Sequence, residues 1–324
     1  MGMVLGIDIG GTSIKAGLFT ESGTLVSTKK IPTGKIVNED AFAAVIGGLE
    51  ELLCSNGASP FDVVAAGLDV PGPVDDNGRV GMMPNAELDA EGLKAAMAEA
   101  FPNMTLAFAN DVNAAAVGEM WKGAARDVSS FALIALGTGV GAGVVVSGKL
   151  VSGAFGAGGE FGHITVNREE ASACGCGRHG CLEQYASASG VVRAYRKECL
   201  ERCIDAVRLQ GPTDSLAVFD AYRAGDEAAQ AAISLMCDSL GFALAQVSAV
   251  IDPPLYLVGG GMGEGFDLFA DELRTAFRAY CLPTCAGARI LPAELGNEAA
   301  MYGGAFLAME ALGVYKGVLK GRVR

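Results

Sequence analysis

The sequence predicts an α/β protein of two related lobes, and three observations carry this prediction. Its 324 residues are 51% hydrophobic and 19% charged, which is enough for two lobes of ordinary domain size with large buried cores. β-rich runs alternate with stretches of helical period along the chain. A unit of strand, glycine turn and strand occurs twice, at residues 4–19 and 131–146. This repeat predicts that each lobe carries a hairpin turn, with a phosphate held between the two turns.

After the first hairpin, the chain alternates between helices and strands. Helical spacing of apolar residues predicts helices over residues 39–54 and 91–100, and β-rich runs predict strands over residues 63–70 and 105–109. The second of these strands leads directly into Asn110-Asp111, where an alanine-rich helix starts. The first third of the chain therefore predicts a complete α/β lobe.

After the second hairpin, helices predominate. A long apolar face predicts a helix over residues 226–251, and a short strand over residues 255–258 then enters a third glycine turn. That turn is expected to lead into a helix over residues 264–279. The last predicted helix is capped by Asn297 and runs to Leu312, with a Gly303-Gly304 pair that would let it pack closely against another element.

The net charge indicates which binding partners to expect, and the cysteine content indicates the cellular compartment. With 24 basic and 37 acidic residues the formal net charge is -13, so nucleic acid and anionic membrane surfaces are repelled, and a small molecule or a protein is expected. Residues from Met3 onward already read as a strand without a signal peptide before it, and the nine cysteines favour a reducing cytoplasm and metal ligation. The uninterrupted apolar run over residues 131–136 is too short to cross a bilayer.

The first hairpin turn, Gly10-Gly11-Thr12, has the composition of an anion-binding loop. Glycines let backbone N–H groups approach a phosphate, Thr12 adds a hydroxyl, and Lys15 adds a positive charge. Asp8 is a carboxylate suited to a hydrated magnesium ion. The two common phosphate and dinucleotide motifs are absent, because the turn leads into a strand. A glycine hairpin without a ligand remains the alternative.

Three cysteines and a histidine form a candidate zinc site. Cys174, Cys176 and Cys181 have the spacing C-x-C-x4-C, and His163 lies upstream. Together they are a full tetrahedral Cys3His set without an open position, which indicates a structural zinc. Free or disulfide-bonded cysteines are the alternative. The carboxylates Glu160 and Glu183 flank the set, so a metal that fixes this loop also fixes them.

Asn110 and Asp111 permit two interpretations. Either residue is a good helix N-cap. The same position, at the carboxyl end of a strand in an α/β sheet, also directs polar groups into a ligand crevice.

Together these motifs resemble the ROK family of sugar kinases and sugar-responsive repressors, over residues 4 to about 312. The motifs that carry the resemblance are Asp8-Ile-Gly-Gly-Thr12 with Lys15, Asn110-Asp111, Gly137-Thr-Gly139, Glu160-x-x-His163, Cys174-x-Cys176-x4-Cys181-x-Glu183 and Gly259-Gly-Gly261. The resemblance implies an actin/hexokinase-like (ribonuclease H-like) fold of two α/β lobes, each on a five-stranded mixed sheet. The expected lobes are residues 1–112 and 113–296, with a zinc loop over 163–181, and the helix over 297–312 is expected to pack back on the first lobe.

The resemblance also implies residue roles. Asp111 would be the general base, Asp8 would act through magnesium, and His163 would bind zinc through one ring nitrogen and the sugar through the other. Sugar contacts are expected from Gly72, Asn85, Asn110, Asp111, Glu160, His163 and Glu183. ATP contacts are expected from Asp8, Gly10, Gly11, Thr12, Lys15, Gly137, Thr138 and Gly139 at the phosphates and from Gly259, Gly260 and Gly261 near the base and ribose.

The expected activity is transfer of the γ-phosphoryl group of ATP to the 6-hydroxyl of a hexose, most favourably glucose. Residues 83–88 lack an aromatic or Gly-Trp pair found in many glucokinases of the family, so N-acetylmannosamine, allose and fructose stay as alternatives. A repressor is disfavoured by the net charge and by the absence of a helix-turn-helix segment before the first strand. A sugar-binding regulator would not need Asp111, and a zinc hydrolase would need an open metal position. The family also implies a homodimer or homotetramer, and polyphosphate remains an alternative donor.

Overall fold

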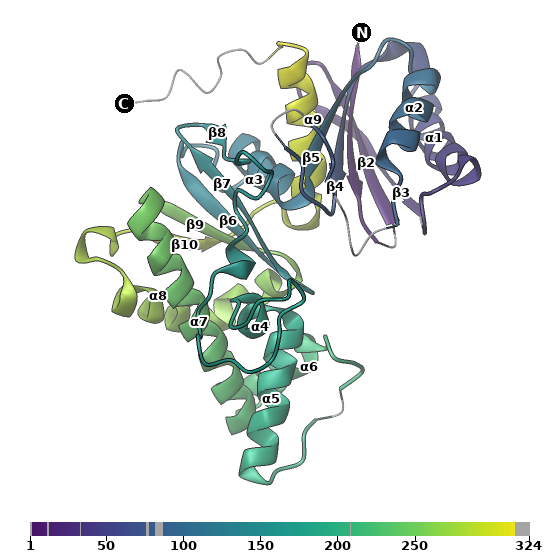
Figure 1. Ribbon diagram of the computed structural model, residues 1–324. Helices are drawn as coiled ribbons and strands as arrows, with labels where there is room; N and C mark the ends of the chain where they lie inside the picture. Colours follow the sequence, from purple (N-terminus) through teal and green to yellow (C-terminus); the bar gives the residue numbers. More distant parts are fainter. Residues whose placement is uncertain are drawn as a thin grey trace. The chain divides into compact units, whose positions relative to one another are not determined.

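The computed structural model describes residues 2–11, 13–32, 34–75, 78–81, 87–207 and 209–314 (Figure 1). The chain divides into two compact units. The first contains Met1–Ser129, Gly143–Gly158 and Asn297–Arg324, and the second contains Ser130–Ala142 and Gly159–Gly296. The first unit thus extends past the lobe boundary expected at residue 112, because helix α3 (Asp111–Trp121) packs against helix α9 (Ala299–Ala311).

The first unit is built on a five-stranded mixed sheet with strand order β3-β2-β1-β4-β5. Strands β1 and β2 form the predicted hairpin, β2 pairs antiparallel with β3, and β4 pairs parallel with β1 and β5. Their bounds are β1 (Met3–Ile9), β2 (Ser13–Thr20), β3 (Leu25–Pro32), β4 (Val63–Val70) and β5 (Thr105–Asn110). The parallel strands β1, β4 and β5 therefore end at one edge of the sheet.

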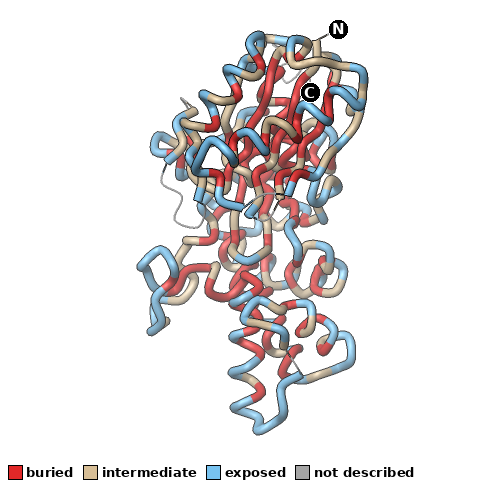
Figure 2. Tube along the Cα trace, turned by 90° about the vertical axis from the view of Figure 1, so that its right-hand side faces the viewer, coloured by how far each residue is buried: buried red, intermediate tan, exposed pale blue. Residues whose placement is uncertain are grey.

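Helices cover both faces of this sheet. On one face, α1 (Glu39–Cys54) and α2 (Ala90–Ala100) contribute Phe42, Leu49 and Met97 to a core with Leu5 and Ile7. On the other face, Met301 and Ala305 of α9 pack against strand residues in a separate cluster. Figure 2 shows buried stretches of the chain in the interior and exposed stretches on the outside.

Glycines bring α9 into close contact with its neighbours. A Cβ atom on Gly6 of β1 would lie 2.0 Å from the Met301 carbonyl oxygen, and one on Gly303 would lie 1.7 Å from the Ala114 carbonyl oxygen of α3. Both distances are shorter than any real contact, so larger side chains would force the backbones apart. The close packing predicted for Gly303 and Gly304 is confirmed at both positions.

The second sheet is also five-stranded, with order β10-β9-β6-β7-β8. It comprises β6 (Phe131–Leu136), β7 (Val140–Val146), β8 (Lys149–Leu150), β9 (Leu255–Gly259) and β10 (Arg289–Pro292). The helices of the second unit are α4 (Glu183–Ala186), α5 (Ala188–Arg202), α6 (Ser215–Arg223), α7 (Glu227–Ile251) and α8 (Phe266–Tyr280). The two five-stranded mixed sheets agree with the expected fold class.

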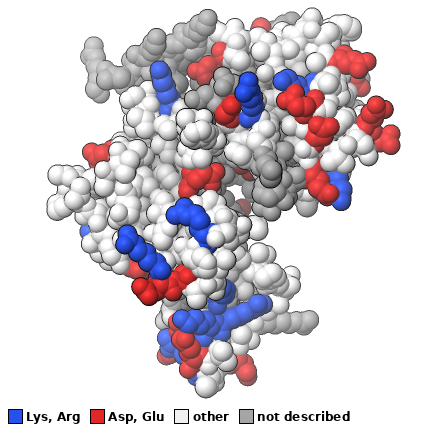
Figure 3. Space-filling view, in the orientation of Figure 1, with Lys and Arg blue, Asp and Glu red and all other residues white. Residues whose placement is uncertain are grey.

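Helix α7 is the one described helix whose length and composition alone would permit a membrane span. In the fold, 61% of its most apolar window is buried, as in the core helix of a globular protein. The buried Tyr256 hydroxyl of β9 bonds to Ser248 Oγ at 2.7 Å and to the Leu244 carbonyl at 3.0 Å, which ties α7 to the sheet. On the face in Figure 3, basic and acidic side chains of the described residues are interspersed.

Three details differ from the sequence-based expectation. Asn297 does not cap α9, because a 3-10 turn over Gly296–Glu298 precedes the helix and places Glu298 at the cap. Another 3-10 turn over Gly261–Gly265 delays the start of α8 from residue 264 to Phe266. Strands β3, β8 and β10 were not predicted; β8 and β10 have only two and four residues.

Candidate functional site

Three carboxylates line the carboxyl ends of the parallel strands in the first unit. Asp8 of β1 and Asp69 of β4 are paired residues in register, and Asp69 pairs with Ala109 of β5. Strand alternation places Asp8 and Asp69 on the same face as Gly6 and Gly67, which lie against α9. Asp111, two residues after Ala109, is the first residue of α3, and its charge acts on Asp69 as that of Asp8 does. The three acids therefore form one row at this edge of the sheet.

Asp69 lies at the centre of this row and is fully buried. Neither of its side-chain oxygens has a hydrogen-bond partner, and one lies where a Cβ atom on Gly304 would be only 2.5 Å away. Desolvation raises the pKa of Asp69 well above its usual range, and the charges of Asp8 and Asp111 raise it further. Sequence reasoning missed Asp69, although a lone acid in the apolar strand Val63–Val70 was a visible signal.

Asp111 begins helix α3 and lies directly beside the cap residue Asn110. Its Oδ1 accepts a hydrogen bond from the Val112 N–H at 2.8 Å. Burial raises the pKa of Asp111 to about 6; the Val112 N–H opposes this rise, and the charge of Asp8 adds to it. The side chain is therefore a carboxylate at neutral pH, but a more basic one than an exposed aspartate.

Asn110 performs the structural role that the sequence allowed for it. Its Oδ1 accepts hydrogen bonds from the N–H groups of Val112 and Asn113, each at 3.0 Å, and so caps α3. Its Nδ2 donates to the Gly72 carbonyl at 3.1 Å. The structure thus brings Gly72 and Asn110 together beside Asp111. Asn85 lies outside the described residues.

The first glycine turn places Lys15 beside Asp8. The Lys15 Nζ lies 3.4 Å from Asp8 Oδ2 and donates to the Asn297 carbonyl at 2.9 Å. Burial raises the pKa of Asp8, while Lys15 opposes the rise. The Gly10 N–H donates to the Ser13 carbonyl at 3.1 Å, and a Cβ atom on Gly11 would meet no atom within 4 Å. Thr12 lies outside the described residues.

In the second unit, the four predicted metal ligands converge. One ligand atom each from His163, Cys174, Cys176 and Cys181 lie within 4.8 Å of one another. Burial raises the pKa of the Cys174 and Cys181 thiols, whereas the Arg178 N–H lowers that of Cys176. A Cys3His set of this compactness suits zinc, and binding it would displace thiol protons.

The two ring nitrogens of His163 lie near different groups. Its Nδ1 lies 3.9 Å from Cys174 Sγ, and its Nε2 lies 3.9 Å from Glu160 Oε2. The Glu160 side chain is 51% exposed and that of His163 32% exposed. Nδ1 is therefore the nitrogen placed for a metal, while Nε2 and the Glu160 carboxylate are accessible together.

Glu183, the first residue of α4, links the metal loop to the second glycine turn. Its Oε2 accepts from the Val140 N–H at 3.1 Å, and its Oε1 lies 3.8 Å from Cys174 Sγ. A Cβ atom on Gly139 would lie 2.5 Å from Glu183 Oε2, so a larger residue there would displace the Glu183 carboxylate. Gly137 accepts from the Ala188 N–H at 2.8 Å, and Thr138 is exposed at the turn. Sequence reasoning did not predict this link.

The third glycine turn follows β9. Gly260 has a φ of 77°, and a Cβ atom there would lie 2.5 Å from the Leu136 carbonyl oxygen, whereas Gly261 faces open space. A cavity of 210 Å³ adjoins the turn, and its lining includes Ser215, Phe219, Arg223 and Gly261. Gly259 ends the strand itself. The turn therefore borders a small pocket beside α6.

Comparisons with known proteins agree on one family. The family model described as "ROK family" matches residues 4–311. A glucokinase of Halalkalibacterium halodurans is 35% identical over 316 residues, which is 94% of each chain. A solved ROK family glucokinase of Streptomyces griseus, in complex with glucose and AMPPNP, has a TM-score of 0.76 and 33% identity, covering 95% of this chain and 100% of that one.

A ROK hexokinase of Thermus thermophilus has a TM-score of 0.80 and 30% identity, covering 96% of this chain and 99% of that one. The two solved structures have the same mixed two-sheet architecture as the chain described above. Because the family model and these relatives span nearly its whole length, the chain belongs to the ROK family.

Proposed function

We propose that this protein is an ATP-dependent hexose kinase that phosphorylates the 6-hydroxyl of glucose, with Asp111 as the general base. The observation that carries the proposal is the environment of Asp111, a half-buried carboxylate at a helix start whose pKa is raised to about 6. A general base works best when its pKa lies near the operating pH. Glucokinases among the relatives support glucose as the acceptor.

Asp111 accepts the proton of the sugar 6-hydroxyl while the oxygen of that hydroxyl forms a bond to the γ-phosphorus of ATP. The bond from that phosphorus to the β,γ-bridging oxygen breaks, and ADP leaves. Such a transfer depends mainly on positioning and on neutralising charge. Asn110 supports this step indirectly, since its cap and its bond to Gly72 fix the backbone around the base.

The glycine turns supply the proposed ATP site. At Gly11, Gly137 and Gly261 neither packing nor a positive φ requires glycine, so the bare backbone leaves space that a side chain would fill. That space fits nucleotide phosphates approaching N–H groups. We assign to the same site the neighbouring residues Gly10, Thr12, Lys15 of β2, Thr138 and Gly139. Gly259 and Gly260 border the pocket proposed for the base and ribose. Asp8 would face the hydrated magnesium that accompanies ATP.

The second unit supplies the proposed sugar contacts. Zinc bound by His163 Nδ1 and the three cysteine sulfurs would be structural, because all four positions are protein ligands. Nε2 of His163 would then donate to a sugar hydroxyl, and Glu160 and Glu183 would accept from others. Gly72 and Asn110 would complete the sugar contacts from the first unit, and we assign Asn85 to the same group.

We further propose a cytoplasmic homodimer or homotetramer. The predicted cytoplasmic location rests on cysteine usage and on the predominantly buried α7. Size-exclusion chromatography with light scattering checks the assembly, and a monomeric mass would contradict it.

A coupled ADP-release assay tests the function directly. The assay uses ATP and magnesium with glucose, N-acetylmannosamine, N-acetylglucosamine, fructose, mannose and allose. We expect glucose to give the highest kcat/KM. If only N-acetylmannosamine, allose or fructose were phosphorylated, the proposed reaction would stand and the proposed substrate would be wrong. Binding of glucose without ADP release from ATP would reject the kinase, unless polyphosphate restores glucose 6-phosphate formation.

A further inference from the structure

The segment that joins the metal ligands His163 and Cys174 is held by side chains. Its ends are tied by backbone contacts: the isolated bridges Thr165 to Cys181 and Ala173 to His179, and the Val166 and Asn167 N–H groups, which donate to the Gly180 carbonyl at 2.8 and 3.3 Å. Residues 168–172, all described, contribute to no strand and make no backbone–backbone hydrogen bond. The position of this middle part therefore depends on side-chain contacts.

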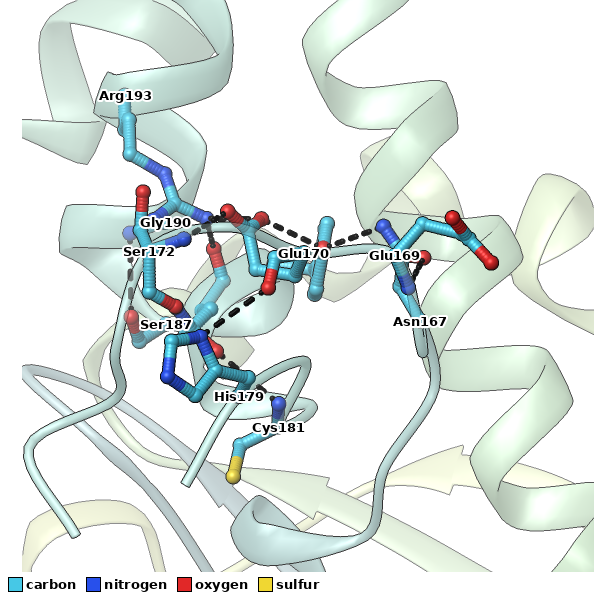
Figure 4. Close-up of polar contacts among 11 residues, drawn as sticks. Asn167, Glu169, Glu170, Ser172, His179, Cys181, Ser187, Gly190 and Arg193 are labelled. Atoms are coloured by element: carbon cyan, nitrogen blue, oxygen red, sulfur yellow. Dashed lines mark hydrogen bonds and ion pairs between the residues drawn. The ribbon is translucent and has the colours of Figure 1, made fainter. Parts of the chain in front are cut away.

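Glu170 is the centre of those contacts (Figure 4). Its Oε1 accepts from the Ser172 N–H at 3.0 Å, and its Oε2 accepts from the Tyr185 hydroxyl at 2.7 Å. Arg193 of α5 lies 3.6 Å from the same Oε2. The Glu170 side chain is only 17% exposed. An exposed ion pair contributes little, but this carboxylate is mostly shielded from water and has all its partners fixed.

Two partners of Glu170 lie on helices: Tyr185 on α4 and Arg193 on α5. Tyr185 is 8% exposed and also accepts from Asn167 Nδ2 at 2.9 Å. Arg193 donates to the Gln184 carbonyl at 2.6 Å and lies over the Tyr185 ring, 5.8 Å from its centroid. The loop middle and the start of α4 thus form one polar network.

Gln184 closes the same network on the metal side. Its Oε1 accepts from the Cys181 N–H at 3.1 Å, and its Nε2 donates to the Ser172 carbonyl at 2.9 Å. One end of the network therefore touches the backbone of a metal ligand, and the other holds the helix that carries Glu183. None of these bonds needs the metal.

We propose that Glu170 is a positioning residue that holds the proposed sugar-binding side chains in place. Through Tyr185, Arg193 and Gln184 it fixes the loop that carries His163 against the helix that carries Glu183, so that both side chains keep their places for the sugar. The proposal rests on the proposed function for the identity of the ligand, whereas the effect on metal retention does not depend on that function.

The adjacent residue Glu169 provides a matched control. It carries the same charge and is exposed, and Figure 4 shows its carboxylate pointing away from the network. Glu170→Ala and Glu169→Ala therefore remove the same charge at neighbouring positions. Glu170→Gln keeps one acceptor oxygen, replaces the other with an NH2 donor and loses the ion pair with Arg193, and Tyr185→Phe removes one hydroxyl.

The experiment measures zinc release from the zinc-loaded protein into a chromophoric chelator, together with KM for glucose and for ATP. We expect Glu170→Ala to release zinc about tenfold faster and to raise the KM for glucose about tenfold, with the KM for ATP near the wild-type value. Tyr185→Phe and Glu170→Gln should fall between Glu170→Ala and the wild type, and Glu169→Ala should equal the wild type.

Two results would overturn the proposal. One is equal behaviour of Glu170→Ala and Glu169→Ala in zinc release and in the KM for glucose. The other is an equal rise in the KM values for glucose and ATP in Glu170→Ala, which would indicate general loosening. If the wild type phosphorylates no hexose, the proposed function fails, but faster zinc release from Glu170→Ala than from Glu169→Ala would still support the positioning role.

Discussion

The two units position their candidate functional residues by opposite means. In the first unit, strand register places Asp8 beside Asp69, Asp111 begins the helix that follows β5, and Asp69 is buried without a hydrogen-bond partner. In the second unit, His163 and Glu160 are accessible, and the loop that carries His163 is held by many side-chain contacts. The first arrangement suits a group whose basicity must be raised, and the second suits groups that must hold fixed directions toward a ligand.

Burial of the carboxylates and the side-chain contacts of the metal loop therefore serve different purposes. Burial raises the pKa of Asp111 despite the N–H that Val112 donates, and a carboxylate with a raised pKa accepts a proton more readily. Groups that select a sugar need precise direction more than altered pKa values, and a metal with a fixed outer network supplies direction. Substitutions in the two halves should therefore give different signatures.

The largest effect should come from Asp111→Asn. The amide keeps the shape of the side chain but does not accept the hydroxyl proton, so we expect kcat to fall about 10²–10⁴-fold while sugar affinity changes little. Steady-state kinetics and glucose-dependent thermal stability measure the two quantities. A kcat within a few-fold of the wild type would remove Asp111 from the role of base.

The pH profile provides a control for this assignment. The base must be ionised to work, and its raised pKa means that activity is lost as pH falls through about 6. The wild-type kcat/KM should then drop about tenfold per pH unit on the acid side. The residual activity of Asp111→Asn should lack this limb.

Cys176→Ser should have a smaller effect, and on sugar binding instead of turnover. Loss of one of four ligands should release zinc and weaken sugar affinity about 10–100-fold through His163 and Glu183, with ATP affinity retained. Metal analysis and calorimetry with glucose check this prediction. Cys54→Ser, at an exposed position of α1, is the control. A zinc-free variant with wild-type glucose affinity would break the link between metal and sugar.

The last prediction, for Asp69→Asn, concerns stability and not activity. Because the pKa of Asp69 is raised in the folded state, its protonated form contributes stability that is fully present below the unfolded value of 3.8 and is lost as pH rises. Relative to the wild type, Asp69→Asn should gain up to about 1.4 kcal/mol in the free energy of unfolding per pH unit above that value.

Urea unfolding between pH 5 and 9 measures this difference, taking roughly that range as the one accessible to a stable fold. Asp205→Asn removes an acid at an exposed position and serves as the control. A stability difference that stays constant with pH would show that Asp69 is already ionised in the folded protein.

The sequence was most informative where local patterns were strong. Helix α1 and strand β4 have the predicted bounds because apolar residues recur at the helical period in one and form a continuous β-rich run in the other. The metal ligands converge as expected, because three cysteines within eight residues leave the loop few alternatives.

Features that depend on tertiary contacts were not predictable in this way. The network around Glu170 joins residues 167–172 to 184–193, and no spacing in the sequence signals that contact. Strand β3 alternates between partly exposed and exposed residues over most of its length, so its apolar signal is weak. The importance of Asp69 arises from its register with Asp8 and from Gly304, which is 235 positions away on α9.

The close packing of α9 also determines the order in which the chain can fold during synthesis. The glycine-lined face of β1 and β4 receives its cover from Met301, Gly304 and Ala305, which leave the ribosome after all of the second unit. Domains generally fold as units while the chain is made. The second unit is continuous from Gly159 to Gly296, so it can become compact while the N-terminal sheet still exposes an apolar face. Until residues 299–311 have been synthesised, the apolar residues of that face lack their cover from α9.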